Sequence, residues 1–354
     1  MLGMLIEHEL QYPKLQPKGV LWSVYGRSAP LFVLLAGVGL TLASGDRARH
    51  RRRAMILTRA PLLLLVGMAL SLGGDGVILQ SFALFFVVGV CVIRLPRWAL
   101  AIAAGTCLVG GPLFLTLLRR HGELTFFGSQ TDVGFRALLD PVRLARGLTL
   151  SYYPAVIWLG FFFVGMLLGR LNLSSAAAGR RLFGWSAITA VSLFTIGWAC
   201  ARAFAPAIGS FGVAPDPPTM WSQHWTTYGF SNSVGWALSS TAVALAIVGG
   251  CVWMTARVRG QVRVLAPLAA LGAMPLTFYV LHFAYLGTAW SQLVLYLTNP
   301  ISLLCMSLVF WFAFAAMAQW WLTRFRRGPL ESVLHTVAFT VTAPTRTGAG
   351  VESD

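Results

Sequence analysis

The chain has 354 residues, of which 57% are hydrophobic and only 11% are charged, and its mean hydropathy is +0.72. Soluble domains carry about 25% charged residues, so these polar side chains are too few to cover a water-exposed surface. The composition excludes a soluble protein and predicts an all-α, polytopic bundle of membrane helices. The formal charge of +16 does not indicate nucleic-acid binding, because nearly all of it is arginine at the ends of apolar runs, where arginine sets topology and contacts lipid headgroups.

The five cysteines lie singly inside or at the ends of apolar runs and show no paired spacing. Neither a zinc site nor a disulfide framework is indicated. We expect no metal, and interpret the cysteines as small packing residues.

The first ten residues, Met1 to Leu10, are apolar for only six positions before the run Glu7-His8-Glu9. A membrane span needs about 20 residues, so this segment is interpreted as the outer half of a helix whose inner half is missing. Residues Gln11 to Ser28 follow as a loop on the outside.

The stretch from Tyr25 to Arg53 organises the topology. An apolar run, Leu31 to Ser44, is followed by a block of five arginines that ends at Arg53. Translocating such a block is unfavourable, and the inner leaflet is anionic. Arg27 is therefore predicted to lie toward the outside and Arg53 toward the cytoplasm.

Further apolar runs are close to the length that a bilayer requires. We predict spans at Met55–Leu72, Val77–Leu95, Trp98–Leu118, Tyr153–Leu171, Leu182–Phe204, Val234–Ala256, Leu265–Leu286 and Pro300–Leu322. With the first half-helix and the span after Arg27 the count is about ten, and both termini are cytoplasmic. All five connections predicted to lie inside are basic, whereas the long outside loop Arg119–Leu150, with its arginines, is the main exception to this pattern.

The chain is predicted to form one transmembrane helical domain over residues 1–327. Residues 328–342 follow as an amphipathic helix on the inner membrane surface, because Pro329 suits a first helical position and apolar residues recur at helical spacing. The tail, residues 343–354, is predicted to be disordered.

Ionisable residues inside or at the ends of spans are costly and are candidates for function. His8, flanked by Glu7, suits a general base or an acyl-carrying nucleophile at the outer surface, with the carboxylate orienting the imidazole. The competing interpretation is an interfacial histidine that only hydrogen-bonds a loop. His282 lies well inside its predicted span, either as an interhelical hydrogen-bonding group or as part of a polar path.

Arg59 lies one turn inside the third span. It either extends its side chain back to the headgroups or forms, with Arg327 and the block that ends at Arg53, a cytoplasmic mouth for phosphate groups. Gly165 and Gly169 form a GxxxG pair, which favours close helix packing over a ligand site.

The chain resembles a known family. YGRSAPLFVLLAGVGLTLASG before the arginine block, YYPAVIWLGFFFVGMLLGRL and VLAPLAALGAMPLTFYVLHF are similar, in this order, to helices of bacterial relatives of the heparan-alpha-glucosaminide N-acetyltransferase catalytic domain. FRRGPLESVLH resembles the closing motif of the related, uncharacterised YeiB-like membrane family. Together these segments extend over nearly the whole chain.

Two departures from the family pattern are visible. The Asp-x-x-Arg-Gly segment that usually precedes Leu-Gly-Met is absent, which leads us to expect a truncated or late-annotated start. The characterised lysosomal member has its catalytic histidine in the loop after the first helix, where residues 11–28 of this chain contain none. His8 is the nearest histidine.

The resemblance implies a transmembrane acyltransferase of the bacterial inner membrane. Acyl-CoA, most simply acetyl-CoA, would bind from the cytoplasm with its phosphates on Arg59 and Arg327, and Arg27 would contribute to the same site. The acyl group would reach an extracytoplasmic glycan or lipid-linked acceptor, with His8 and Glu7 as catalytic residues and His282 along the path. No metal is required, and a second copy of the chain is an open partner.

Two other functions remain open at this point. A transporter or flippase for a small polar or lipid-linked substrate would suit the bundle, although no internal duplication of the type common in such folds is visible. A non-catalytic membrane scaffold would suit the short first helix and the missing loop histidine.

Overall fold

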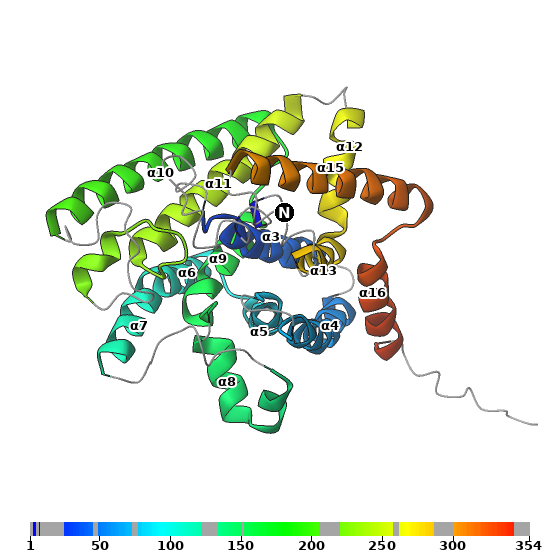
Figure 1. The fold of residues 1–354 in the computed structure, drawn as a ribbon, viewed down its shortest axis with the longest axis horizontal. Coiled ribbons are helices and arrows are strands. Elements are labelled where there is room, and N and C mark those ends of the chain that lie inside the picture. Colours follow the sequence, from blue (N-terminus) through cyan, green and yellow to red (C-terminus); the bar gives the residue numbers. More distant parts are fainter. Residues whose placement is uncertain are drawn as a thin grey trace, which may run out of the picture.

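The structure is a computed structural model, described over residues 3–4, 7, 25–44, 49–72, 77–121, 134–150, 152–204, 220–257, 262–286 and 300–342. Within these ranges the regular structure is helical and there is no β-strand (Figure 1). The predicted all-α class is therefore confirmed for the described part of the chain. His8 and the tail 343–354 lie outside the described residues.

The helices follow the predicted apolar runs for most of the chain. In chain order they are α3 (Ser28–Ala43), α4 (Arg49–Leu70), α5 (Leu79–Val92), α6 (Arg97–Gly105), η3 (Thr106–Gly110), α7 (Gly111–Arg120), η4 (Phe135–Leu139), α8 (Pro141–Leu150), α9 (Ala155–Leu168), α10 (Ala176–Phe204), η5 (Trp221–Trp225), α11 (Val234–Arg257), α12 (Val262–Ala273), α13 (Pro275–Leu286), α15 (Pro300–Arg324) and α16 (Pro329–Val341).

Five of the described helical stretches are long and apolar enough to cross a membrane. They lie in α4, α6 to α7, α10, α11 and α15, and two bent pairs, α8 with α9 and α12 with α13, raise the count to as many as seven. Helices α3 and α5 are apolar but, at 16 and 14 residues, shorter than the roughly 20 residues of a full span. A helical membrane bundle is thus supported, whereas a total of ten spans and the orientation of the termini stay predictions.

The ninth predicted span, Leu265–Leu286, is not one straight helix. Helices α12 and α13 meet at an angle of 86°, and Met274 between them is not helical. Pro275 begins α13, and a proline lacks the N–H that would continue the hydrogen bonding and disfavours helical geometry at the residue before it. We call this bend, Ala273 to Leu276, the elbow. A second unpredicted element is α8, which occupies the end of the expected loop Arg119–Leu150.

The span from Arg97 to Arg120 contains one irregular turn. Residues Thr106 to Gly110 form a π-helix between α6 and α7. A single π-turn inserts an extra residue without ending the helix, so the three pieces act as one span.

Glycines let α3 and α9 cross at backbone contact. A Cβ on Gly165 would lie 1.9 Å from the carbonyl oxygen of Leu34, and one on Gly37 would lie 2.1 Å from that of Phe162. Any side chain at either position would force the helices apart. The predicted packing role of Gly165 and Gly169 is confirmed, since a Cβ on Gly169 would also meet Thr41 at 2.9 Å.

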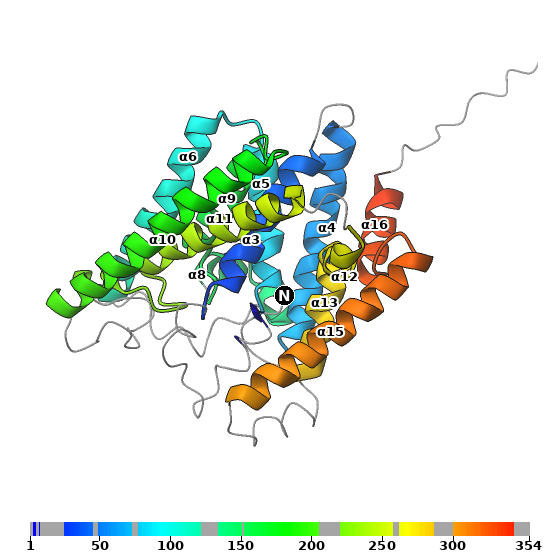
Figure 2. The same cartoon turned by 90° about the horizontal axis from the view of Figure 1, so that it is seen from above.

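Two groups of helices lie on either side of α3 (Figures 1 and 2). One group contains α9, α10 and α11 with α6 and α7 outside them, and the other contains α12, α13, α15 and α16. Helix α16 packs against α4 and α13. The amphipathic helix on the membrane surface that the sequence indicates for residues 328–342 stays a prediction.

Candidate functional site

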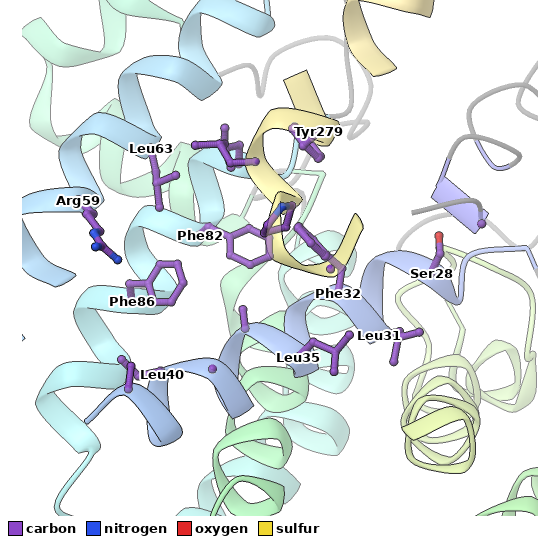
Figure 3. Close-up of a pocket in the computed structure, with 18 of the residues that line it drawn as sticks. Ser28, Leu31, Phe32, Leu35, Leu40, Arg59, Leu63, Phe82, Phe86 and Tyr279 are labelled. Atoms are coloured by element: carbon purple, nitrogen blue, oxygen red, sulfur yellow. The ribbon is translucent and has the colours of Figure 1, made fainter. Parts of the chain in front are cut away.

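A cavity lies beside α3 and follows this helix along its length (Figure 3). Its volume is about 750 Å³, within the range of small-molecule sites. One face of α3 lines it at helical spacing, through Ser28, Leu31, Phe32, Leu35, Ala36, Gly39, Leu40 and Ala43. Sixteen residues of α-helix extend about 24 Å, so the cavity is a long channel.

The other walls come from four elements. Helices α4 and α5 contribute Leu63, Phe82 and Phe86, and further lining residues come from α11 and the elbow. The lining side chains are mostly apolar, and the polar ones are Arg27, Ser28, Arg59 and Tyr279. The Tyr279 hydroxyl accepts the backbone N–H of Ile78 at 3.1 Å, which fixes α13 against the start of α5.

Arg27 and Ser28 form one end of the channel. Arg27 is 3% exposed, and its two terminal nitrogens donate to the carbonyl of Trp236 at 3.3 Å, to the hydroxyl of Ser240 and to the carbonyl of Thr227. These bonds tie the start of α3 to α11 and to the segment before it. The third nitrogen, Nε, is buried and has no hydrogen-bond partner among the described residues.

Glu7 caps the N-terminus of α3 at this end. Its Oε1 accepts the backbone N–H groups of Arg27 at 2.9 Å and Ser28 at 3.0 Å, and its Oε2 accepts the hydroxyl of Ser28. A carboxylate here satisfies the free N–H groups of the first helical turn and is stabilised by the helix dipole. Glu7 is therefore fully engaged as a helix cap.

Arg59, on α4, lies at the opposite end of the channel from Ser28 (Figure 3). Its side chain is half-buried, and its Nε is also buried with no hydrogen-bond partner among the described residues. The charges of Arg59 and Arg327 are near enough to repel each other. A phosphate-binding mouth formed by these two arginines stays a prediction.

His335 on α16 joins this basic mouth. Burial, and then the positive charges of Arg327 and Arg59, lower the pKa of His335. Arg59 lines the cavity, and Arg327 and His335 lie near enough to Arg59 for their charges to interact with it. Among the described residues, neither arginine forms an ion pair with a carboxylate, which leaves the mouth positive.

Glu331 has the same role on α13 that Glu7 has on α3. Its Oε1 accepts the N–H groups of Leu276 at 2.7 Å and Thr277 at 3.0 Å, and its Oε2 accepts the Thr277 hydroxyl at 2.5 Å. The backbone N–H of Leu330 donates to the Thr277 oxygen at 3.3 Å. Helix α16 is thereby fixed to the elbow.

The third described carboxylate, Asp140, accepts the N–H groups of Val142 and Arg143, each at 3.0 Å, at the start of α8. All three carboxylates in the described part of the chain thus cap helices. Within the same residues no group of three His, Cys, Asp or Glu side chains could hold a metal ion.

His282 is fully buried in an aromatic cluster. Its ring lies 5.0 Å from that of Tyr279, 4.6 Å from that of Phe283 and stacks on Phe278 at 6.0 Å. Tyr279 lines the channel and His282 does not, so the histidine is one ring away from the cavity. Its part in a polar path stays a prediction.

One buried histidine, His224 in η5, was not predicted from the sequence. Its Nε2 lies 2.9 Å from the Thr116 hydroxyl, and its Nδ1 accepts the N–H of Val234 at 3.4 Å. Nδ1 as an acceptor leaves the proton on Nε2, and burial lowers the pKa of His224 to about 4. It is a neutral histidine that joins α7, η5 and α11, and its position in a glycine- and serine-rich loop gave no signal of this contact.

The channel can accept a long, mainly apolar ligand with acceptor atoms at both ends. An arginine lies at each end, and the Nε–H of each is buried without a hydrogen-bond partner among the described residues. Buried donors without partners are unfavourable, so a phosphate or carbonyl oxygen at either end would be stabilising.

Comparison with known proteins gives two matches that together extend over most of the chain. Residues 4–199 match the family model described as heparan-alpha-glucosaminide N-acetyltransferase, catalytic, and residues 196–340 match a protein of unknown function, DUF418. The channel is lined from both matched regions. No curated protein and no solved structure matched. Since the first match includes more than half of the residues, the chain belongs to the heparan-alpha-glucosaminide N-acetyltransferase catalytic family, a family of transmembrane acetyltransferases.

Proposed function

We propose that the protein transfers an acetyl group from cytoplasmic acetyl-CoA to a hydroxyl or amine on the outer side of the bacterial inner membrane. One observation carries the proposal: an apolar channel about 24 Å long has, at each end, an arginine with an unsatisfied, buried Nε. Acetyltransferases of this type use acetyl-CoA, whose extended pantetheine arm joins phosphates at one end to a thioester carbonyl at the other.

The two ends of the channel suit the phosphates and the thioester carbonyl of acetyl-CoA. At the mouth formed by Arg59, Arg327 and His335, guanidinium groups suit bidentate bonds to phosphate. At the other end Arg27 suits a carbonyl oxygen, and the walls between the two ends are mainly apolar. Arg27 is already held by three bonds, so it would donate without reorganising.

The chemistry is transfer of an acetyl group from a thioester to an oxygen or nitrogen, which gives an ester or an amide. The acceptor's lone pair attacks the carbonyl carbon, the carbon–sulfur bond breaks, CoA leaves as the thiol, and the proton lost by the acceptor balances that gain. Arg27 stabilises negative charge on the carbonyl oxygen during attack. Because Glu7 is engaged as a cap, His8 remains our proposed base.

The experiment is an acetyl-CoA titration of the protein in lipid nanodiscs, with Arg59→Ala and Arg327→Ala. Each lost charged hydrogen bond should weaken binding about 10- to 100-fold. Arg324→Ala is the matched control, because Arg324 lies on the same predicted side but contacts only its own helix, over the ring of Trp320 at 4.3 Å; it should change binding less than twofold.

Glucosamine is the first acceptor to test, with free CoA thiol as the readout. His8→Ala should abolish thiol release and leave acetyl-CoA binding intact. Absence of saturable binding up to millimolar acetyl-CoA would refute the proposal.

A further inference from the structure

The channel has, besides its two ends, an opening along one side. Leu35 on α3 is 44% exposed and Ile247 on α11 is 43% exposed, although both line the cavity. Gly39 and Gly272 line it as well, are exposed, and have open space where a side chain would begin. The opening therefore lies between α11 and the elbow, and its rim is apolar.

The position of this opening determines what can enter. It lies partway along α3 and α11, and α11 is long and apolar enough to span a membrane. The exposed rim would therefore face acyl chains and not water. A water-soluble molecule would gain nothing from this route, whereas an alkyl chain could pass from the bilayer into the channel with no loss of apolar contact.

The Arg27 end of the channel is polar, whereas the rim of the side opening is apolar. It presents the Nε–H of Arg27 and the hydroxyl of Ser28, and α3 leads from it along the channel to the rim at Leu35 and Gly39. A molecule with a polar head at Ser28 and a chain along α3 matches this arrangement. No described carboxylate is free to hold a cationic group there, because Glu7 is occupied by Arg27 and Ser28.

We propose that the acceptor is a membrane amphiphile, in which a lipid chain carries the hydroxyl or amine, and that it enters from the bilayer through the opening at Leu35 and Ile247. This inference rests on the proposed function and specifies its acceptor. The donor then enters through the basic mouth and the acceptor through the side opening, so the two substrates approach the Arg27 end from different entrances.

The kinetic test uses two acceptors with one head group, a methyl and a dodecyl glucosaminide, with acetyl-CoA and protein in phosphatidylcholine nanodiscs. The dodecyl acceptor should have at least a tenfold higher kcat/KM at equal mole fraction. Ile247→Trp, which narrows the opening, should remove this preference by lowering kcat/KM for the dodecyl acceptor more than for the methyl acceptor. Ile188→Trp, on the exposed face of α10, is the matched control and should change neither.

A labelling test needs no acetyl-CoA. A dodecyl glucosaminide with a diazirine in mid-chain should label peptides 31–43 and 243–247 of the wild type, and Ile247→Trp should lose this labelling. Labelling confined to the outer face of α10 would overturn the inference, as would equal kcat/KM for both acceptors. A failed acetyl-CoA titration would instead refute the proposed function, and labelling would still decide whether the amphiphile occupies the channel.

Discussion

Replacing Glu331 by alanine removes the carboxylate that accepts two backbone N–H groups and one hydroxyl at the start of α13. Each N–H left without a partner at this half-buried helix end costs about 1–3 kcal/mol, and losing the negative charge at the helix N-terminus costs about 0.3–1 kcal/mol more. Since water reaches part of the site, we expect a total loss of about 2–4 kcal/mol. The elbow also lines the channel, so acetyl-CoA affinity should fall with stability.

Glu331→Gln separates charge from hydrogen bonding. The amide oxygen can still accept the N–H groups of Leu276 and Thr277, but the amide nitrogen cannot accept the Thr277 hydroxyl. The charge and this one hydrogen bond are lost, and the expected cost is about 1–2 kcal/mol. Reversible unfolding in mixed detergent micelles, with and without acetyl-CoA, measures both variants. The expected order of stability is wild type, then glutamine, then alanine.

Asp140→Ala is the matched control for this experiment. Asp140 also caps a helix with two N–H bonds, but on an exposed surface where water can replace it, so its loss should cost clearly less than that of Glu331. The reasoning would be refuted if Glu331→Ala unfolded like the wild type, or if glutamine were as destabilising as alanine.

Three further predictions follow from single positions. Gly39→Leu should weaken acetyl-CoA binding at least tenfold, because the leucine side chain would enter open channel space. Gly184→Leu on α10, where a side chain would also meet no neighbouring atom, is the control and should leave binding unchanged. Equal affinities of the two variants would contradict the channel as the donor site. Gly165→Leu should destabilise the fold by about 3 kcal/mol, since its Cβ would lie 1.9 Å from the Leu34 carbonyl oxygen, and an unchanged unfolding midpoint would argue against the α3–α9 crossing. The pKa of His224 is about 4 when folded and about 6.5 when unfolded. The contribution of neutral His224 to folding stability is therefore complete above pH 6.5 and is lost as pH falls toward 4. His224→Gln should flatten the pH dependence of thermal unfolding in this window, and parallel curves for variant and wild type would contradict the assignment.

The helical class and the close contact of α3 with α9 could be predicted because both depend on local patterns. Long apolar runs specify helices in a membrane, and the spacing of Gly165 and Gly169 indicates a face without side chains. The positions of Arg59 and Arg327 near one another also agreed with prediction, since both flank spans on the same expected side.

The elbow and the caps were not predictable in the same way. Hydropathy is continuous through Pro275, and a proline in a membrane helix is often tolerated, so the sequence alone favoured one straight span. Glu331 acts on a helix that begins more than fifty residues earlier, and Glu7 acts twenty residues later. Such contacts depend on tertiary structure, which no local pattern encodes.

The channel itself could not be read from the sequence, because it exists only where α3, α4, α5, α11 and the elbow leave space between them. Its α3 face has an ordinary apolar pattern. His224 was missed for a related reason, since its partners Thr116 and Val234 belong to separate helices.

The π-turn at Thr106–Gly110 has a consequence for the phase of the helix around it. Buried residues recur there at every fourth position, at Leu100, Ala104, Leu108, Pro112 and Thr116. In a straight α-helix, residues four positions apart differ in direction around the helix axis by about 40°, which adds up to about 160° over four steps. Thr116, the last of these residues, would then point away from α9. The wider turn takes back part of this rotation.

Both tight contacts with α9 therefore form together, Leu108 against Gly160 and Gly111 against Val156. A relative that lacks one residue within Thr106–Gly110 could form a regular α-helix here and still direct the same side chains toward α9. A deletion elsewhere in α7 would instead rotate the following residues by about 100°. Tolerance to a single-residue deletion should thus be concentrated in these five positions.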